Sequence, residues 1–147
     1  MIGAAMPAPA SVCTACGGRW LDTADRIAEL REGILYLHSD QFFPGWSVLV
    51  LRRHATELFE LERDERARLM DEVSDVARAL KLAFDARKVN YALFGNLVPH
   101  VHWHLIPRLA TDPAPLEPVF AVSHEPVRLP TIERADRIAR IRSRLGR

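Results

Sequence analysis

The sequence predicts an α+β domain whose sheet is largely antiparallel. Apolar and β-branched runs come first, a long amphipathic helix follows, and two more strand-like runs precede a last helix. Strands and helices in this order are typical of α+β domains. The 147 residues are enough for one domain with its own core and leave little room for a second.

Three strands are expected before the long helix, at residues 26–33, 33–40 and 47–54. The first two would meet near Gly33, and the third is apolar and β-branched, as in a buried strand. Ahead of the third strand, "FFPGWS" predicts a turn, because Pro44 and Gly45 favour turn conformations.

The long helix is expected over residues 64–86, where apolar side chains recur at spacings of three and four. The recurring residues are Leu69, Val73, Val76, Leu80 and Ala83. Two further strands, an extended proline-rich loop and a basic amphipathic helix are expected after it, at residues 88–95, 100–107, 110–120 and 131–145. Pro107 would end the last strand.

The composition argues against several classes of protein. Apolar residues make up 48% and charged residues 27% of the chain, as in an ordinary soluble domain. The net charge is +1, so no global basic field predicts binding to nucleic acid or to a membrane surface. No apolar run approaches the ~18 residues of a transmembrane helix. The first residues lack the positive region of a signal peptide and predict an unstructured lead-in, so we expect a cytoplasmic protein.

Three of the six histidines alternate within one short segment, at His100, His102 and His104. On a strand, alternate side chains share a face, so these imidazoles would line one face about 6.5–7 Å apart. The residues between them would pack on the other face, namely Val101, Trp103 and Leu105. Neighbouring imidazoles discourage each other's protonation, which favours neutral, nucleophilic rings around a phosphate or a metal ion.

The segment "HVHWHLIP" resembles the signature of the histidine-triad (HIT) family, His-apolar-His-apolar-His-apolar-apolar. The resemblance covers residues 26–110 and is strongest in "VNYALFGNLVPHVHWHLIPR" and "PGWSVLVLRRHATELFEL". The form of the motif is similar to that of bacterial members described as diadenosine polyphosphate hydrolase-like.

The resemblance implies a HIT-like antiparallel sheet with one long helix and a C-terminal helix. An N-terminal arm with Cys-x-x-Cys would occupy residues 1–20, the HIT domain 21–110, and a C-terminal extension of the same domain 111–147. It also implies a homodimer that shares a sheet. The substrate would be a purine nucleotide with a leaving group on its α-phosphate, either a dinucleoside polyphosphate or a nucleoside phosphoramidate.

By the same resemblance, His102 would attack the α-phosphorus and form a nucleotidyl-histidine, which water or another acceptor resolves. His104 would hydrogen-bond the oxygens of that phosphate, aided by backbone N–H groups. His100 would either orient the nucleophile's surroundings or bind a structural metal. Asn96, in a Gly-Asn loop, would bond phosphate oxygens or hold the loop by a bond to the backbone.

Other residues are candidates for contacts to the substrate. Asn90 corresponds, with a shift of about one residue, to an asparagine upstream of the triad in relatives, and Arg108 is placed to reach a phosphate. The acidic or amide residue that binds ribose in relatives falls here on His38, with Asp40 as the nearby acid. Trp46 occupies a position where many relatives have a histidine, a change expected to reshape the pocket.

The spacing "CTAC" is common among metal sites, because two thiolates three residues apart can reach one ion. Cys13 and Cys16 would be completed by His54 and His100, the combination that binds zinc in some HIT branches and in galactose-1-phosphate uridylyltransferases. Such a zinc would be structural, with four protein ligands. Two alternatives remain: the arm binds no metal, or the two cysteines form a redox pair.

Three other functions are consistent with the motif. A nucleotidyl transferase would use the same intermediate with an acceptor in place of water. A nucleotide-binding protein with vestigial activity is less consistent with the intact triad. A metalloenzyme with all three histidines as ligands lacks an obvious carboxylate partner. The remaining tryptophans, Trp20 and Trp103, are expected to be packing residues.

Overall fold

The computed structural model describes residues 10–146, so the first nine residues of the expected arm and lead-in lie outside the described residues. Within residues 10–146 the chain forms one five-stranded sheet with the order β1-β2-β3-β5-β4 and antiparallel pairing throughout. The strands are β1 (Arg26–Glu29), β2 (Gly33–Leu37), β3 (Ser47–Leu51), β4 (Lys88–Ala92) and β5 (His102–Arg108). The predicted α+β class with an antiparallel sheet is confirmed.

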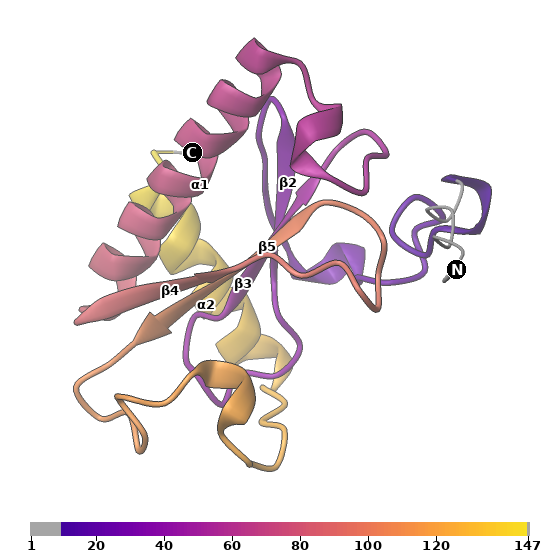
Figure 1. Ribbon diagram of the computed structural model, residues 1–147. Coiled ribbons are helices and arrows are strands. Elements are labelled where there is room, and N and C mark those ends of the chain that lie inside the picture. The colour runs from indigo at the N-terminus through magenta and orange to yellow at the C-terminus, as the bar shows by residue number, and fades with distance from the viewer. Residues whose placement is uncertain (1–9, 147) are drawn as a thin grey trace.

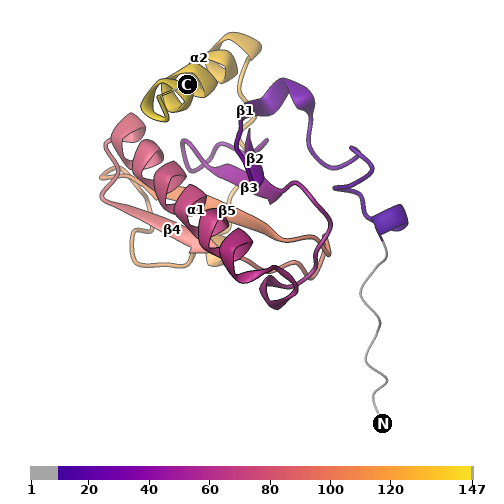
Figure 2. The same ribbon diagram turned by 90° about the horizontal axis from the view of Figure 1, so that it is seen from above.

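Helix α1 (Arg63–Phe84) connects β3 to β4 across one face of the sheet (Figure 2). All five apolar residues that predicted this helix are buried against the sheet. The helix ends at Asp85, whose left-handed backbone (φ 50°) marks the exit into β4. Helix α2 (Thr131–Arg144) covers the same face beside α1 and contributes Ile138 and Ile141 to the core (Figure 1).

The two faces of β5 have different surroundings, as the alternation of side chains requires. Leu105 is fully buried beneath the helices, and Trp103 packs against the same core. On the opposite face, Ile106 belongs to a second cluster with Phe43, Trp46 and Val119. Val119 comes from the segment after β5, which therefore covers part of the face that the helices leave open.

The strand that carries the histidine motif differs from its predicted bounds at both ends. It begins at His102 rather than at residue 100, because the backbone N–H groups of His100 and Val101 bond to loop carbonyls instead of the ladder. At the other end it continues through Pro107, which pairs with β4 after the ladder with β3 has ended at Leu105. A proline is tolerated where a strand has a neighbour on one side only.

No helix within residues 10–146 is long and apolar enough to cross a bilayer.

The turn before β3 depends on a glycine. Gly45 has φ +88°, and a Cβ at this position would lie 2.5 Å from Cε2 of Phe84, whose ring is buried in the core. We predict that Gly45→Ala lowers the free energy of unfolding by about 2–4 kcal/mol through backbone strain and overpacking. Urea denaturation measures this loss.

Gly95→Ala is the matched control, because Gly95 has a similar φ of +79° but its Cβ would meet nothing nearer than 3.7 Å. It isolates the backbone strain, about 1 kcal/mol. Equal losses for the two variants would show that contact with Phe84 does not matter.

Candidate functional site

His102 and His104 lie next to each other on the open face of β5, with ring centroids 5.2 Å apart. Nδ1 of His102 lies 2.7 Å from the carbonyl oxygen of His100. A carbonyl oxygen only accepts, so Nδ1 carries the hydrogen and Nε2 keeps a free lone pair. Burial lowers the pKa of His102, while the bond to the His100 carbonyl opposes this effect. The structure therefore holds His102 as a neutral imidazole with Nε2 unprotonated.

His104 has the opposite tautomer. The indole Nε1 of Trp46 lies 3.1 Å from Nδ1 of His104, and an indole nitrogen only donates. Nδ1 of His104 is therefore the acceptor, and in the neutral ring the hydrogen resides on Nε2. Burial, with smaller contributions from His102 and His38, lowers the pKa of His104 to about 3. His104 remains neutral at pH 7 and offers an Nε2–H donor beside the lone pair of His102.

The first histidine of the motif lies apart from the other two. His100 precedes β5, and its ring is turned towards the N-terminal arm rather than into a row with His102. Its Nε2 lies 2.7 Å from the carbonyl oxygen of Leu51 and donates to it, which leaves Nδ1 as an acceptor. The expected row of three imidazoles on one strand is thus a pair, with His100 connected to the pair through its backbone carbonyl.

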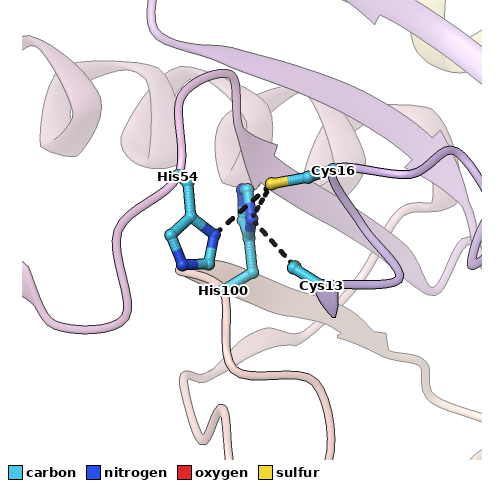
Figure 3. A group of neighbouring side chains, drawn as sticks. All are labelled: Cys13, Cys16, His54 and His100. Atoms are coloured by element: carbon cyan, nitrogen blue, oxygen red, sulfur yellow. Dashed lines mark hydrogen bonds between the residues drawn. The ribbon is translucent and has the colours of Figure 1, made fainter. Parts of the chain in front are cut away.

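Two cysteines and two histidines converge at the arm (Figure 3). The ligand atoms of Cys13, Cys16, His54 and His100 all lie within 4.8 Å of one another. Sγ of Cys16 is 3.3 Å from Nδ1 of His54 and 3.5 Å from Nδ1 of His100, and Sγ of Cys13 is 3.6 Å from the latter. Four ligands about 2.0–2.3 Å from one zinc ion would lie about 3.3–3.8 Å apart. The measured distances between the ligand atoms therefore fit tetrahedral coordination of one zinc ion.

The same arm places Trp20 against the histidine pair. The ring of Trp20 meets the ring of His102 edge to face, with centroids 4.6 Å apart. Sequence reasoning treated Trp20 as a packing residue and missed this contact. The available signal was its position four residues after Cys16, whose expected metal partners include the first histidine of the motif.

The two candidates for ribose recognition have different surroundings. His38 stacks on Trp46 with ring centroids 4.0 Å apart and lies 5.9 Å from the ring of His104. Asp40 instead binds the segment after β5, with Oδ2 2.7 Å from Nε2 of His124 and Oδ1 accepting from the backbone N–H of Val127 at 2.9 Å. His38 thus adjoins the histidine pair, and the carboxylate of Asp40 is engaged within the chain.

Arg108 and Asn90 bond to each other at the end of the sheet. Arg108 is 4% exposed, and its Nη1 donates to Oδ1 of Asn90 at 2.8 Å and to the carbonyl of Glu117 at 2.8 Å. It also pairs with the buried carboxylate of Asp112. This arrangement fastens the segment after β5 to the sheet, so the geometry gives no support to the expectation that Arg108 reaches a phosphate.

Asn96 is exposed in the loop that follows Gly95 and precedes His100. This geometry leaves both of its expected roles open.

Two cavities are lined by residues whose rings lie beside the histidine pair. One, of about 340 Å³, adjoins the pair through Trp20 and His38 and is lined by charged residues as well, among them Asp25 and Arg134. The other, of about 460 Å³, is lined by Phe120, whose ring lies 5.5 Å from that of His104. Apolar residues are prominent in its lining, including Val89, Ala92, Phe94, Leu116 and Val119. The cavity that adjoins the pair through Trp20 and His38 is thus the more polar of the two, and the one that adjoins it through Phe120 is the more apolar.

Comparison with known proteins found a matching family model and several similar structures. The family model for the HIT domain matches residues 22–111 of this chain. A histidine triad protein from Bradyrhizobium japonicum, blr8122, is 34% identical with a TM-score of 0.75, over 85% of this chain and 96% of that one. A histidine triad protein from Sinorhizobium meliloti is 31% identical with a TM-score of 0.75, over 92% and 98%.

A more distant structure shares the fold. The zinc-bound histidine triad family protein from Mycobacterium smegmatis is 21% identical with a TM-score of 0.67, over 94% of this chain and 96% of that one. Among curated proteins no match to this chain was found.

The HIT domain that matches residues 22–111 covers more than half of the chain and includes the His102–His104 pair. The chain therefore belongs to the HIT family.

Proposed function

We propose that this chain is a nucleotide hydrolase that acts at an α-phosphate through a nucleotidyl-histidine. The observation that carries the proposal is the hydrogen bond from His102 Nδ1 to the His100 carbonyl, because it leaves Nε2 of His102 as the nucleophile. Nε2 forms a bond to phosphorus while the bond from phosphorus to the leaving group breaks. The leaving group departs with the electron pair and takes a proton from solvent, and water then cleaves the P–N bond to regenerate His102.

Both neighbours of His102 support this chemistry. The imidazole becomes positively charged when Nε2 is nucleotidylated, and its Nδ1–H bond to the carbonyl of His100 then becomes a charge-assisted one. The Nε2–H of His104 is oriented to donate to a phosphoryl oxygen as negative charge develops there. The N–H of Trp46 preserves that orientation, because it occupies Nδ1 of His104.

The two cavities support a substrate with two distinct ends. We propose a purine nucleoside on the polar side and the leaving group on the more apolar side, as in a dinucleoside polyphosphate or a nucleoside phosphoramidate. A nucleotidyl transferase would use the same first step with another acceptor in place of water. The homodimer implied by the family resemblance stays a prediction.

We further propose that Cys13, Cys16, His54 and His100 hold a structural zinc. The donor set and its spacing support four-coordinate zinc without an open position, and the M. smegmatis protein of the same fold is zinc-bound. The bond from Nε2 of His100 to the Leu51 carbonyl orients the ring so that Nδ1 faces the thiols. Such a zinc would hold the arm to the loop before β5 and would take no part in the reaction.

The nucleophile is tested with diadenosine tetraphosphate and an adenosine phosphoramidate. We predict an adenylyl adduct in the intact mass of the wild type after an early quench. His102→Asn should form no adduct and should release AMP about 10³-fold more slowly or worse. Circular dichroism and zinc content identical to the wild type serve as the control for folding. Full AMP release by His102→Asn would refute the proposal.

The role of Trp46 is tested by Trp46→Phe, which keeps a ring but removes the N–H donated to His104. We predict a kcat about 3- to 10-fold lower, the kinetic equivalent of one lost hydrogen bond. Trp103→Phe is the matched control, because Nε1 of Trp103 is buried on the other face without a hydrogen-bond partner. If both variants have the same kcat, Trp46 does not orient His104.

Elemental analysis tests the zinc. Protein purified from zinc-supplemented medium should contain one zinc ion per chain, and Cys16→Ser or His54→Ala should contain far less, because each removes one of four ligands. His124→Ala, which leaves the cluster intact, should retain the full content. A wild type that contains no zinc would contradict the assignment.

A further inference from the structure

The cavity of about 340 Å³ lies between the arm and β2, beside the proposed nucleophile. Its lining comes from three separate parts of the chain: Trp20, Leu21, Asp22, Asp25, Leu37, His38, Ser39, Gln41, Arg128, Leu129 and Arg134. Trp20 contacts the ring of His102, and His38 lies beside the ring of His104. A ligand in this cavity would therefore contact two side chains that themselves adjoin the imidazoles.

The chemistry of the lining suits a nucleoside. Trp20 supplies an aromatic surface of the kind on which bases stack. Asp25 is 8% exposed, and its buried Oδ1, which accepts no hydrogen bond from the described residues, lies 3.2 Å from Nε of Arg134 in an ion pair. Such a carboxylate is suited to accept from ribose hydroxyls. Asp40, the other acid near His38, is already bonded to His124 and Val127.

Side-chain contacts connect the arm that carries Trp20 to the domain. In its described part, the backbone hydrogen bonds outside regular structure connect arm residues to each other, as from Gly17 to Cys13 and from Arg19 to Thr14. Contacts between the described part of the arm and the domain include those of Cys13 and Cys16 with the two histidines, and the contact of Trp20 with His102. Three residues separate Cys16 from Trp20, so fixing the sulfur restricts where the indole can lie.

We propose that Trp20 is a binding residue for the nucleoside of the substrate, and that the Cys–His cluster controls nucleotide binding by holding the arm in place. The inference rests on the proposed function and deepens it. With the metal bound, Trp20 closes one side of the cavity next to His102. Without it, the two thiols and two imidazoles have no common ligand, the arm leaves its position, and the cavity loses its aromatic side.

Titration calorimetry with AMP tests this on the full chain. Zinc-loaded wild type should bind AMP, and zinc-loaded Trp20→Ala should bind it about tenfold more weakly, as for a lost stacking contact. Trp20→Phe, which keeps a ring, is the matched control and should retain most of the affinity. Removing zinc from the wild type with a chelator should weaken AMP binding to a similar extent.

Combining Trp20→Ala with the removal of zinc gives the more decisive test. If zinc acts by positioning Trp20, stripping zinc from Trp20→Ala should cause little further loss of AMP affinity. Trypsin provides a readout that is independent of nucleotide: cleavage after the exposed Arg19 should be faster in stripped than in loaded wild type.

Each other result counts against the inference. Equal AMP affinity of loaded wild type and loaded Trp20→Ala would show that Trp20 does not contact the nucleoside. A full additional loss on stripping Trp20→Ala would show that zinc acts by another route, such as His100. If loaded wild type binds no AMP, this inference and the proposed function fail together, whereas normal AMP binding that is insensitive to Trp20 overturns this inference alone.

Discussion

The hydrogen bond between His102 Nδ1 and the His100 carbonyl is the contact on which the rest of the site depends. It joins two consecutive members of the motif that the fold otherwise separates, since one begins β5 and the other lies in the loop before it. The carbonyl that accepts this bond lies outside the ladder, because β5 begins at His102. The ring of His100 is then available to the arm, and the lone pair of His102 faces the open side of the sheet.

The two imidazoles of the pair are chemically complementary although both are neutral. One has its acceptor nitrogen exposed to a ligand and the other its donor nitrogen, and each tautomer is fixed by a single partner whose own role cannot be reversed. A carbonyl fixes the first and an indole fixes the second. Trp46 therefore serves the site twice, because its N–H donates to His104 and its ring stacks on His38.

Local patterns predicted the fold because its elements follow from local sequence. The spacing of Leu69, Val73 and their neighbours determines which side of α1 is buried, and alternation in the motif separates Leu105 from His104. The site depends instead on contacts between distant segments. His124 reaches Asp40 across 84 residues and Cys13 reaches His100 across 87, and no local pattern encodes such pairings. Resemblance supplied the cysteine–histidine set, and the only sequence signal for the contact of Trp20 with His102 was its position four residues after Cys16.

The position of β5 between β3 and β4 has a consequence for the order in which the chain acquires its structure. The first three strands can pair as hairpins soon after they are synthesised, but β5 is synthesised last of the five and must pair with β3 on one side and with β4 on the other. His100 immediately precedes β5 in the chain. The thiols of Cys13 and Cys16 are therefore synthesised long before His100, one of their two histidine partners. A metal ion that binds all four residues therefore binds only after β1 to β4 have been synthesised.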